Sequence, residues 1–239
     1  MSSALPDPAT VRTLFLDAGG VLVRPNFDRV AAALLERGIE VSARALDAAE
    51  ARARKEMDRA AERVPTDSER NFVYFNLVLG QAGVRRSPEA DAALVALKRY
   101  HDRHNLWEWV PPGVEAALAE MAGGGRRLVV VSNSNGTVRR LLERVGLARH
   151  FALVVDSAEE GFEKPDPRIF RTALERAGAA PEDVVHVGDM YEADVVGARS
   201  ARLRAVLLDE AGLYPEADCP RIRSLGELAE HLRRPPAQK

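Results

Sequence analysis

Short, nearly continuous apolar runs alternate along the chain with longer segments in which apolar residues recur every three or four positions. Such runs, rich in Val and Leu, are typical of parallel strands that are buried on both faces. They predict five strands, at 11–16, 127–131, 151–155, 183–187 and 203–208. Helical patterns occur at 114–121, 137–145, 167–177 and 193–200. Strands that alternate with helices in this way predict an α/β fold with a doubly wound parallel sheet, similar to a Rossmann fold.

The segment 24–107 breaks this alternation, because it shows helical periodicity and no convincing strand. Its clearest helix starts after Ser42 and ends before Pro65, with apolar residues three and four apart on a single stripe. Two more helices are predicted at 71–81 and 88–100, the second with Ser87 as its N-cap and a proline in its first turn. We therefore expect a helical domain, 24–107, inserted into a core that is formed by 1–23 and 108–239.

Composition limits the function classes that fit this two-part organisation. The 239 residues carry a formal net charge of -2, which argues against a nucleic-acid partner. The single cysteine, Cys219, excludes an intramolecular disulfide and a cysteine-based zinc cluster. No apolar stretch has the length of a signal peptide or of a membrane span. We expect a cytoplasmic protein with no membrane partner, as a monomer or homodimer.

Polar residues follow every predicted strand. They are Asp17, Ser132 with Asn133, Asp156, Asp189 and Asp209. Ligands of open parallel α/β sheets bind outside the carboxyl ends of the strands, where these side chains should gather. Asp and Ser also serve as ordinary turn and cap residues, so each one alone is a weak signal. As a set, they predict a functional site at this edge of the sheet.

Two of the strand ends carry signs of anion binding. Asp17 is followed by Gly19 and Gly20, and glycine lets a ligand approach the backbone closely. Ser132 and Asn133 precede a predicted helix, where a hydroxyl and free backbone N–H groups suit an anion. Both segments therefore favour a negatively charged ligand such as phosphate.

Two further motifs carry charged residues. The proline-bounded loop Gly161-Phe162-Glu163-Lys164-Pro165-Asp166-Pro167 precedes a predicted helix, and its lysine could neutralise an anion or a carboxylate. Asp189 and Asp194, five residues apart at a strand-to-helix turn, suit a hard cation with oxygen ligands such as Mg²⁺. Lys164 is also the one lysine of the predicted core before the C-terminal residue, in a chain that otherwise uses arginine.

The order and spacing of these four motifs resemble those of the haloacid dehalogenase (HAD) superfamily, and the likeness covers nearly the whole chain. The segments GFEKPDPRIF and VGDMYEADVVGA are its most specific parts. The resemblance implies a Rossmann-like HAD core, and the helical insertion is similar to the family's C1-type cap. It further implies an Mg²⁺-dependent hydrolase, most often a phosphatase that acts on a small phosphorylated metabolite.

The resemblance also implies roles for individual residues. Asp17 would be the nucleophile that forms an aspartyl-phosphate, and Lys164 would steady it and the developing negative charge. Substrate phosphate would be bound by Ser132, Asn133 and Gly20. The Mg²⁺ ligands would be Asp17, the carbonyl of Gly19 and Asp189, with Asp194 as a direct ligand or as support.

Position 19 departs from the family pattern. Phosphatases of the family usually have a second aspartate there, which protonates the leaving group and then activates water. Gly19 cannot do this, and such a group typically contributes about 10²–10⁴-fold to the rate. Tyr191, Glu192 and residues of the helical insertion are possible substitutes, although a structural role is expected for each.

Three alternatives to the phosphatase stay open because of Gly19. Haloacid dehalogenases lack the second aspartate, but they also replace the acidic pair that Asp189 and Asp194 retain here. Phosphonoacetaldehyde hydrolases use a cap lysine as a Schiff base, a role for which Lys55 would be the candidate. The third alternative is a protein of low activity that binds a phosphorylated ligand.

Overall fold

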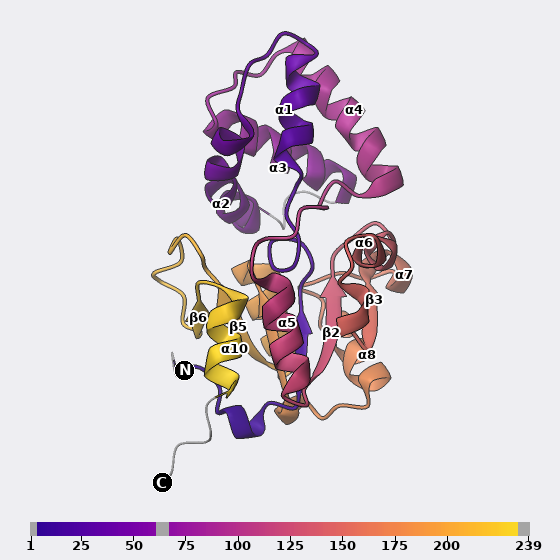
Figure 1. The fold of residues 1–239 in the computed structure, drawn as a ribbon, viewed down its shortest axis with the longest axis vertical. Coiled ribbons are helices and arrows are strands. Elements are labelled where there is room, and N and C mark those ends of the chain that lie inside the picture. Colours follow the sequence, from indigo (N-terminus) through magenta and orange to yellow (C-terminus); the bar gives the residue numbers. More distant parts are fainter. Residues whose placement is uncertain (1–3, 61–66, 234–239) are drawn as a thin grey trace. The chain divides into compact units, whose positions relative to one another are not determined.

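The computed structural model describes residues 4–60 and 67–233, with side chains described for all of these except 59, 60 and 67–71. The chain divides into two compact units (Figure 1). Unit 1 comprises Met1–Arg24 and Val110–Lys239, and unit 2 comprises Pro25–Trp109. None of the helices in the described ranges combines the length and the apolar character that crossing a membrane requires.

Unit 1 is built on a six-stranded sheet with the strand order β3-β2-β1-β4-β5-β6, in which all neighbours are parallel. The strands are β1 (Thr13–Leu16), β2 (Arg127–Ser132), β3 (Leu153–Asp156), β4 (Val184–Gly188), β5 (Arg204–Leu208) and β6 (Arg221–Ile222). The doubly wound parallel sheet is thus confirmed, and each of the five predicted strands occurs. The edge strand β6 was not predicted, because two residues give no apolar run.

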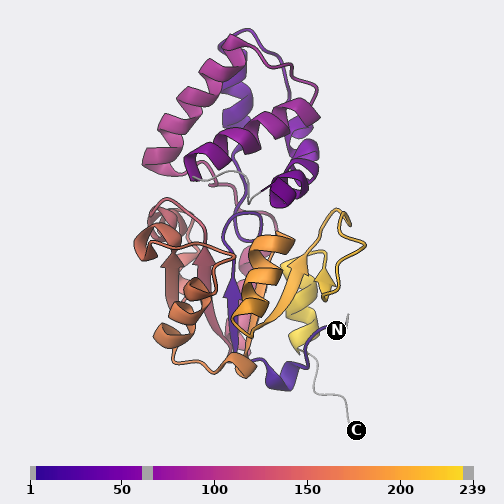
Figure 2. The same ribbon diagram turned by 180° about the vertical axis from the view of Figure 1, so that it is seen from behind.

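Helices cover both faces of this sheet. The helices of unit 1 are α5 (Val114–Gly123), α6 (Val138–Arg144), α7 (Ser157–Glu160), α8 (Pro167–Ala177), α9 (Gly197–Ser200) and α10 (Leu225–Arg233). Helices α5 and α10 lie together in front of the sheet in Figure 1, whereas α8 and α9 lie in front of it in Figure 2. Short 3₁₀ turns occur at η1 (Pro8–Thr10), η3 (Ala148–His150) and η4 (Pro181–Asp183).

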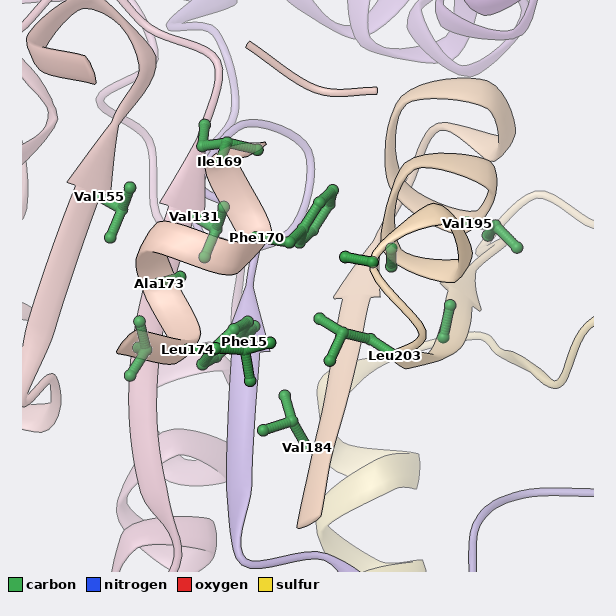
Figure 3. Close-up of a cluster of buried hydrophobic side chains, with 14 of the residues drawn as sticks. Phe15, Val131, Val155, Ile169, Phe170, Ala173, Leu174, Val184, Val195 and Leu203 are labelled. Atoms are coloured by element: carbon green, nitrogen blue, oxygen red, sulfur yellow. The ribbon is translucent and has the colours of Figure 1, made fainter. Parts of the chain in front are cut away.

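The face under α8 and α9 holds a core of apolar side chains (Figure 3). Phe15 from β1 and Phe170 from α8 are fully buried in this core, together with Val195. Burial of aromatic rings of this size is a large source of stability in a domain. This packing fixes where α8 begins and where the segment after β4 lies, and both segments contribute to the site described below.

The predicted helix 193–200 takes a different form. The segment after β4 is a π-helical turn, η5 (Tyr191–Val196), which then continues into α9. Turns of this type are rare and occur frequently at functional sites. The glycine at the start of α9 permits close packing, because a Cβ on Gly197 would lie 2.9 Å from Pro165 Cα and 3.0 Å from the Phe170 ring.

Unit 2 consists of helices and contains no strand among its described residues. The helices are α1 (Phe27–Leu35), α2 (Ala43–Ala60), α3 (Asp67–Gln81) and α4 (Pro88–His104). Leu46, Ala53 and Met57 on the predicted stripe of α2 are buried, as expected. The predicted N-cap is also confirmed, because the Ser87 side chain accepts a hydrogen bond from the Ala90 amide. The predicted stop at Pro65 lies outside the described residues.

The two ends of unit 2 are joined to each other by hydrogen bonds around Glu108. The Asn26 amide donates to the Leu106 carbonyl at 2.9 Å, and the Asn26 side chain donates to Glu108 at 3.0 Å. The Tyr100 hydroxyl and Arg29 also donate to this carboxylate. Burial acts to raise the pKa of Glu108, but these donors outweigh it and hold the pKa below its usual value.

Candidate active site

The sheet order places the first and fourth strand ends side by side. Residue Leu16 of β1 is paired with Val130 of β2 on one side and with Val187 of β4 on the other. Asp17 and Asp189 follow directly beyond these pairs. In the order β3-β2-β1-β4-β5-β6, strands β1 to β3 are added toward one edge of the sheet and β4 to β6 toward the other. The strand order therefore switches between β1 and β4, and ligands bind at such a switch point.

Three carboxylates and one ammonium are buried together at this point. Asp17, Asp189 and Asp194 have potential ligand atoms within 4.8 Å of one another. The Lys164 ammonium lies 2.8 Å from Asp17 Oδ1 and 2.6 Å from Asp194 Oδ1. None of the four residues is more than 8% exposed. The sequence motifs after β1, before α8 and after β4 therefore meet in one buried charged cluster.

Asp194 accepts four hydrogen bonds from the protein itself. Its Oδ1 accepts from Lys164 Nζ and lies 2.9 Å from Nε2 of His186. Its Oδ2 accepts from the backbone amides of Asp189 and Met190, at 3.1 and 3.0 Å. A carboxylate offers about four lone-pair sites, so this side chain is saturated. Its position therefore fixes both the lysine and the turn that carries Asp189.

The Asp194 carboxyl group occupies the space that a side chain at position 188 would need. A Cβ built on Gly188 would lie 2.0 Å from Asp194 Cγ and 2.3 Å from its Oδ2. Distances this short are impossible between non-bonded atoms, so any larger residue would displace the carboxylate. Glycine at the end of β4 is thus required by the close approach of a charged side chain.

We expect Gly188→Ala to destabilise the protein by about 1–3 kcal/mol, as overpacking of a filled site does. The displaced Asp194 would also lose its contacts with Lys164, so activity should fall far more than stability. Gly123→Ala is the matched control, because a Cβ there meets nothing within 4 Å. Urea denaturation and a turnover assay on both variants check this expectation, and equal behaviour of the two would contradict it.

The charges of the cluster do not balance. Three carboxylates face one ammonium, which leaves an excess of two negative charges when all are ionised. Burial raises the pKa of Asp17, and the nearby Lys164 only partly opposes this. Burial also disfavours the charged lysine, but Asp17 and Asp194 outweigh it and raise the pKa of Lys164. A buried cluster with this excess of negative charge favours a further cation.

The donor set fits a magnesium ion. Oxygen ligands from one or two carboxylates are what Mg²⁺ usually takes from a protein. Asp17 Oδ1 is buried, and its one close contact among the described residues is the ion pair with the Lys164 ammonium at 2.8 Å. Asp194, in contrast, has its lone pairs occupied. The residues that fit as metal ligands are therefore Asp17 and Asp189, with Asp194 as support.

Lys164 is held in place by the side chain of Asn133. Asn133 Nδ2 donates to the Lys164 carbonyl at 2.9 Å, and its Oδ1 accepts from the Lys164 amide at 2.7 Å. Asn133 thus lies beside Lys164, and its side-chain amide is bonded to the backbone of the lysine. Ser132, at the end of β2, is 2% exposed and lies at the same end of the sheet as Asp17.

The turn after β1 contains both predicted glycines. The Gly20 amide donates to the Val23 carbonyl at 2.8 Å, and Gly19 forms an isolated bridge with Val23. Gly20 has a φ of 77°, a left-handed conformation that favours glycine. The backbone of this turn folds back on itself directly beyond Asp17.

Two of the strand-end carboxylates have structural roles instead. Asp156 accepts hydrogen bonds from the amides of Gly136 and Ala158, at 3.2 and 3.1 Å. Asp209 accepts from the amides of Leu213 and Tyr214. Asp156 thereby shapes the loop that follows Ser132, and Asp209 shapes the loop after β5. Sequence position alone could not separate these carboxylates from those of the cluster.

The possible substitutes for the missing acid of Gly19 lie elsewhere. The Tyr191 hydroxyl donates to Asp218 at 2.6 Å, and Arg199 contacts the same carboxylate. Glu192 is exposed. The Tyr191 hydroxyl is thus bonded to a surface carboxylate, and the structural role expected for Glu192 stays a prediction.

Two residues of the site were missed by sequence reasoning. His186 lies in the middle of β4, fully buried, and contacts Asp194. A histidine within an otherwise apolar strand, two residues before Gly188, was the available signal. The importance of Gly188 itself depends on the approach of Asp194, which no local pattern shows.

Comparisons with known proteins agree with the fold. A family model described as haloacid dehalogenase-like hydrolase matches residues 11–202. The chain therefore belongs to the haloacid dehalogenase-like hydrolases, as the resemblance of its motifs predicted. A solved structure of the putative HAD-hydrolase YfnB from Bacillus subtilis, bound to magnesium, is similar in fold, with a TM-score of 0.69 and 22% identity. The match covers 94% of this chain and 99% of that one.

Curated relatives include enzymes named as phosphatases. The phosphoserine phosphatase of Thermus thermophilus is 48% identical over 59% of this chain and 55% of its own length. The glyceraldehyde 3-phosphate phosphatase of Methanopyrus kandleri is 31% identical over 78% of this chain and 76% of its own. For the first of these, the chain spans only about half the length of the relative.

Proposed function

We propose that this chain is an Mg²⁺-dependent phosphatase that acts on a small phosphorylated metabolite through an aspartyl-phosphate. The observation that carries the proposal is the buried Asp17, ion-paired with Lys164 and adjacent to Asp189 at the switch point of the sheet. The names of the two phosphatase relatives support a phosphate ester as substrate.

Asp17 would perform the covalent step. One carboxylate oxygen attacks phosphorus while the bond from phosphorus to the leaving oxygen breaks, which gives an acyl phosphate and an alcohol or phenol. Water then attacks the same phosphorus, which releases inorganic phosphate and restores the carboxylate. Burial that raises the pKa of Asp17 also removes water from its oxygens, which favours attack when a cation is present.

The surrounding residues would bind and orient the phosphoryl group. Lys164, fixed by Asn133 and Asp194, would hold positive charge beside Asp17 as negative charge develops. The Ser132 hydroxyl, the Asn133 backbone and the turn at Gly20 would contact phosphoryl oxygens. When bound by Asp17, the Gly19 carbonyl and Asp189, Mg²⁺ would offset the repulsion between the carboxylate and the phosphate.

Gly19 restricts which leaving groups react well. No side chain at this position can protonate the departing oxygen, so the proton has to come from another group or from solvent. Phenolic leaving groups need this proton less than alkoxides do. We further propose that unit 2 acts as the C1-type cap that selects the substrate, and that nucleic acid is not a partner.

A panel of phosphate monoesters tests the proposal. Phosphate release from p-nitrophenyl phosphate, phosphoserine and glyceraldehyde 3-phosphate should require Mg²⁺ and fall at least about 100-fold with chelator. The aryl ester should react fastest. Turnover that is unaffected by chelator, or no turnover of any ester, would contradict the phosphatase.

Gly19 also favours a second candidate, cleavage of a carbon–phosphorus or carbon–halogen bond. Halide release from a haloacid without Mg²⁺ would identify a dehalogenase. Borohydride trapping of an imine on Lys55 would identify a phosphonoacetaldehyde hydrolase. If Gly19→Asp creates phosphatase activity in a protein that has none, a phospholigand-binding protein is the better description.

A further inference from the structure

His186 is a buried polar residue that the proposed mechanism does not use. It lies in β4 with none of its surface exposed. Its Nε2 is 2.9 Å from Asp194 Oδ1, and its ring packs edge-on against Phe170 at 4.9 Å between centroids. Phe170 belongs to the apolar core in Figure 3, so one face of the imidazole is held by packing. The ring is therefore held by an aromatic contact as well as by its polar contact.

The protonation state of this histidine follows from its partners. Lys164 and the hydrogen bond from His186 overcome the effect of burial and hold the pKa of Asp194 well below its usual value, so this carboxylate only accepts. Nε2 must then carry the proton. The other nitrogen, Nδ1, is buried with no hydrogen-bond partner among the described residues. Nε2, the nitrogen that faces this carboxylate, is therefore the donor of the contact.

We propose that His186 is a positioning residue that sets the orientation of the Asp194 carboxylate through its Nε2–H donor. Oδ1 of this carboxylate is shared between the Lys164 ammonium and the imidazole, whereas Oδ2 meets the two backbone amides. With the imidazole donor in place, Oδ1 meets Lys164 and Oδ2 meets the amides of Asp189 and Met190.

The orientation of the Asp194 carboxylate affects two charged residues of the site, Asp189 and Lys164. The turn that carries Asp189 is held by the Oδ2 contacts, and the Lys164 ammonium is held by the Oδ1 contact. Loss of the donor would loosen the position of both without removing a charge from the cluster. The effect of His186 on catalysis rests on the proposed function. The hydrogen bonds that hold Asp194 do not depend on that function.

The first test uses the unaltered protein without metal. Long-range ¹H–¹⁵N spectra of the imidazole report which nitrogen carries the proton. We expect a proton on Nε2 of His186. An Nε2 that carries no proton would overturn the proposal, and this result does not depend on any activity.

The second test separates the donor from the packing of the ring. His186→Phe keeps an aromatic ring against Phe170 and lacks the donor, whereas His186→Gln places an amide N–H near the position of Nε2. Amide exchange of Asp189 and Met190 in metal-free protein should accelerate at least about tenfold in the Phe variant and stay within about threefold in the Gln variant. The buried Val129 amide in β2 serves as the internal reference.

Exchange that is unchanged in His186→Phe would show that the ring only packs, and would overturn the proposal. If the Phe variant does not fold, the tautomer of the native protein and the exchange in His186→Gln decide the matter. In the active enzyme, the Mg²⁺ concentration for half-activation should rise about tenfold in the Phe variant and recover in the Gln variant. An enzyme without phosphatase activity would remove only this last readout.

Discussion

Asp17→Asn should abolish turnover, by at least about 10³-fold, because the variant loses the nucleophile on which the covalent route depends. The amide has nearly the same size and shape as the carboxylate, so the fold should persist. Steady-state phosphate release in the presence of Mg²⁺ measures the loss. Substantial residual activity would mean that Asp17 is not the nucleophile.

The same substitution should not reduce stability in metal-free protein. Burial raises the pKa of Asp17 above its ordinary value, so the folded state disfavours the ionised form. A group with a raised folded pKa makes the protein less stable as pH rises through these pKa values. At neutral pH the uncharged Asp17→Asn variant should therefore equal or exceed the native protein in its free energy of unfolding. Activity and stability would then move in opposite directions, as is common at functional sites.

Asp209→Asn is a suitable control for the nucleophile variant. Asp209 is also a buried carboxylate at the end of a strand, but its oxygens accept from the amides of Leu213 and Tyr214. Its amide variant should lose about 1–3 kcal/mol of stability through unpaired loop groups and retain activity within about tenfold. If Asp209→Asn loses turnover as completely as Asp17→Asn, the loss in both variants reflects impaired folding and not the removal of a reacting group.

Lys164→Met should be the most destabilising single change of the site. The side chain is 2% exposed and is the ammonium partner of Asp17 and Asp194. Removing one partner of a buried ion pair typically costs about 3–5 kcal/mol, because the other charges remain buried. Turnover should also fall, since the charge beside the nucleophile is lost. Chemical denaturation and the phosphate assay measure the two effects.

Lys98→Met provides the matched control. Lys98 pairs with Asp102 at 2.7 Å on the surface of α4, where both side chains are more than two-fifths exposed. An exposed pair of this kind is worth about 0–1 kcal/mol, so this variant should differ little from the native protein. Equal losses in the two variants would contradict the account of the buried cluster.

The double variant Lys164→Met with Asp194→Asn separates charge burial from packing. If the cost of Lys164→Met arises from uncompensated carboxylates, neutralising Asp194 should restore part of the stability. Residues that contact each other show coupling of about 0.5–3 kcal/mol in such a cycle. If the changes in the free energy of unfolding of the two single variants simply add in the double variant, the interaction between Lys164 and Asp194 contributes nothing to stability. Lys164→Arg should not restore activity, because a planar guanidinium does not fit the place of a compact ammonium.

Much of the fold could be predicted from local patterns. The continuous apolar runs predicted five of the six strands, and the prediction 167–177 coincides with α8 (Pro167–Ala177). Periodicity works here because each strand is buried on both faces and each long helix has one buried side. Two exceptions are short or irregular: β6 has two residues, and the segment 191–196 forms a π-helical turn. The nine-residue helices α1 (Phe27–Leu35) and α10 (Leu225–Arg233) were also not predicted individually.

The sequence by itself determined the strands, the family motifs and the residues Asp17, Lys164, Asp189 and Asp194, because each of these follows from a local run of residue types. Only the tertiary structure decided which strand ends are neighbours, since that depends on the sheet order. It separated Asp156 and Asp209, whose oxygens hold loop amides, from the carboxylates that surround the lysine.

The tertiary structure also decided how the four charged residues are held. Asp194 has its lone pairs occupied, partly by His186, and it packs against Gly188. Asn133 binds the backbone of Lys164. All of these contacts join segments that are distant in the chain or folded sharply back. The physical reason is that a hydrogen bond requires two groups at a defined distance and angle. A linear pattern specifies which groups are available, and packing specifies which of them meet.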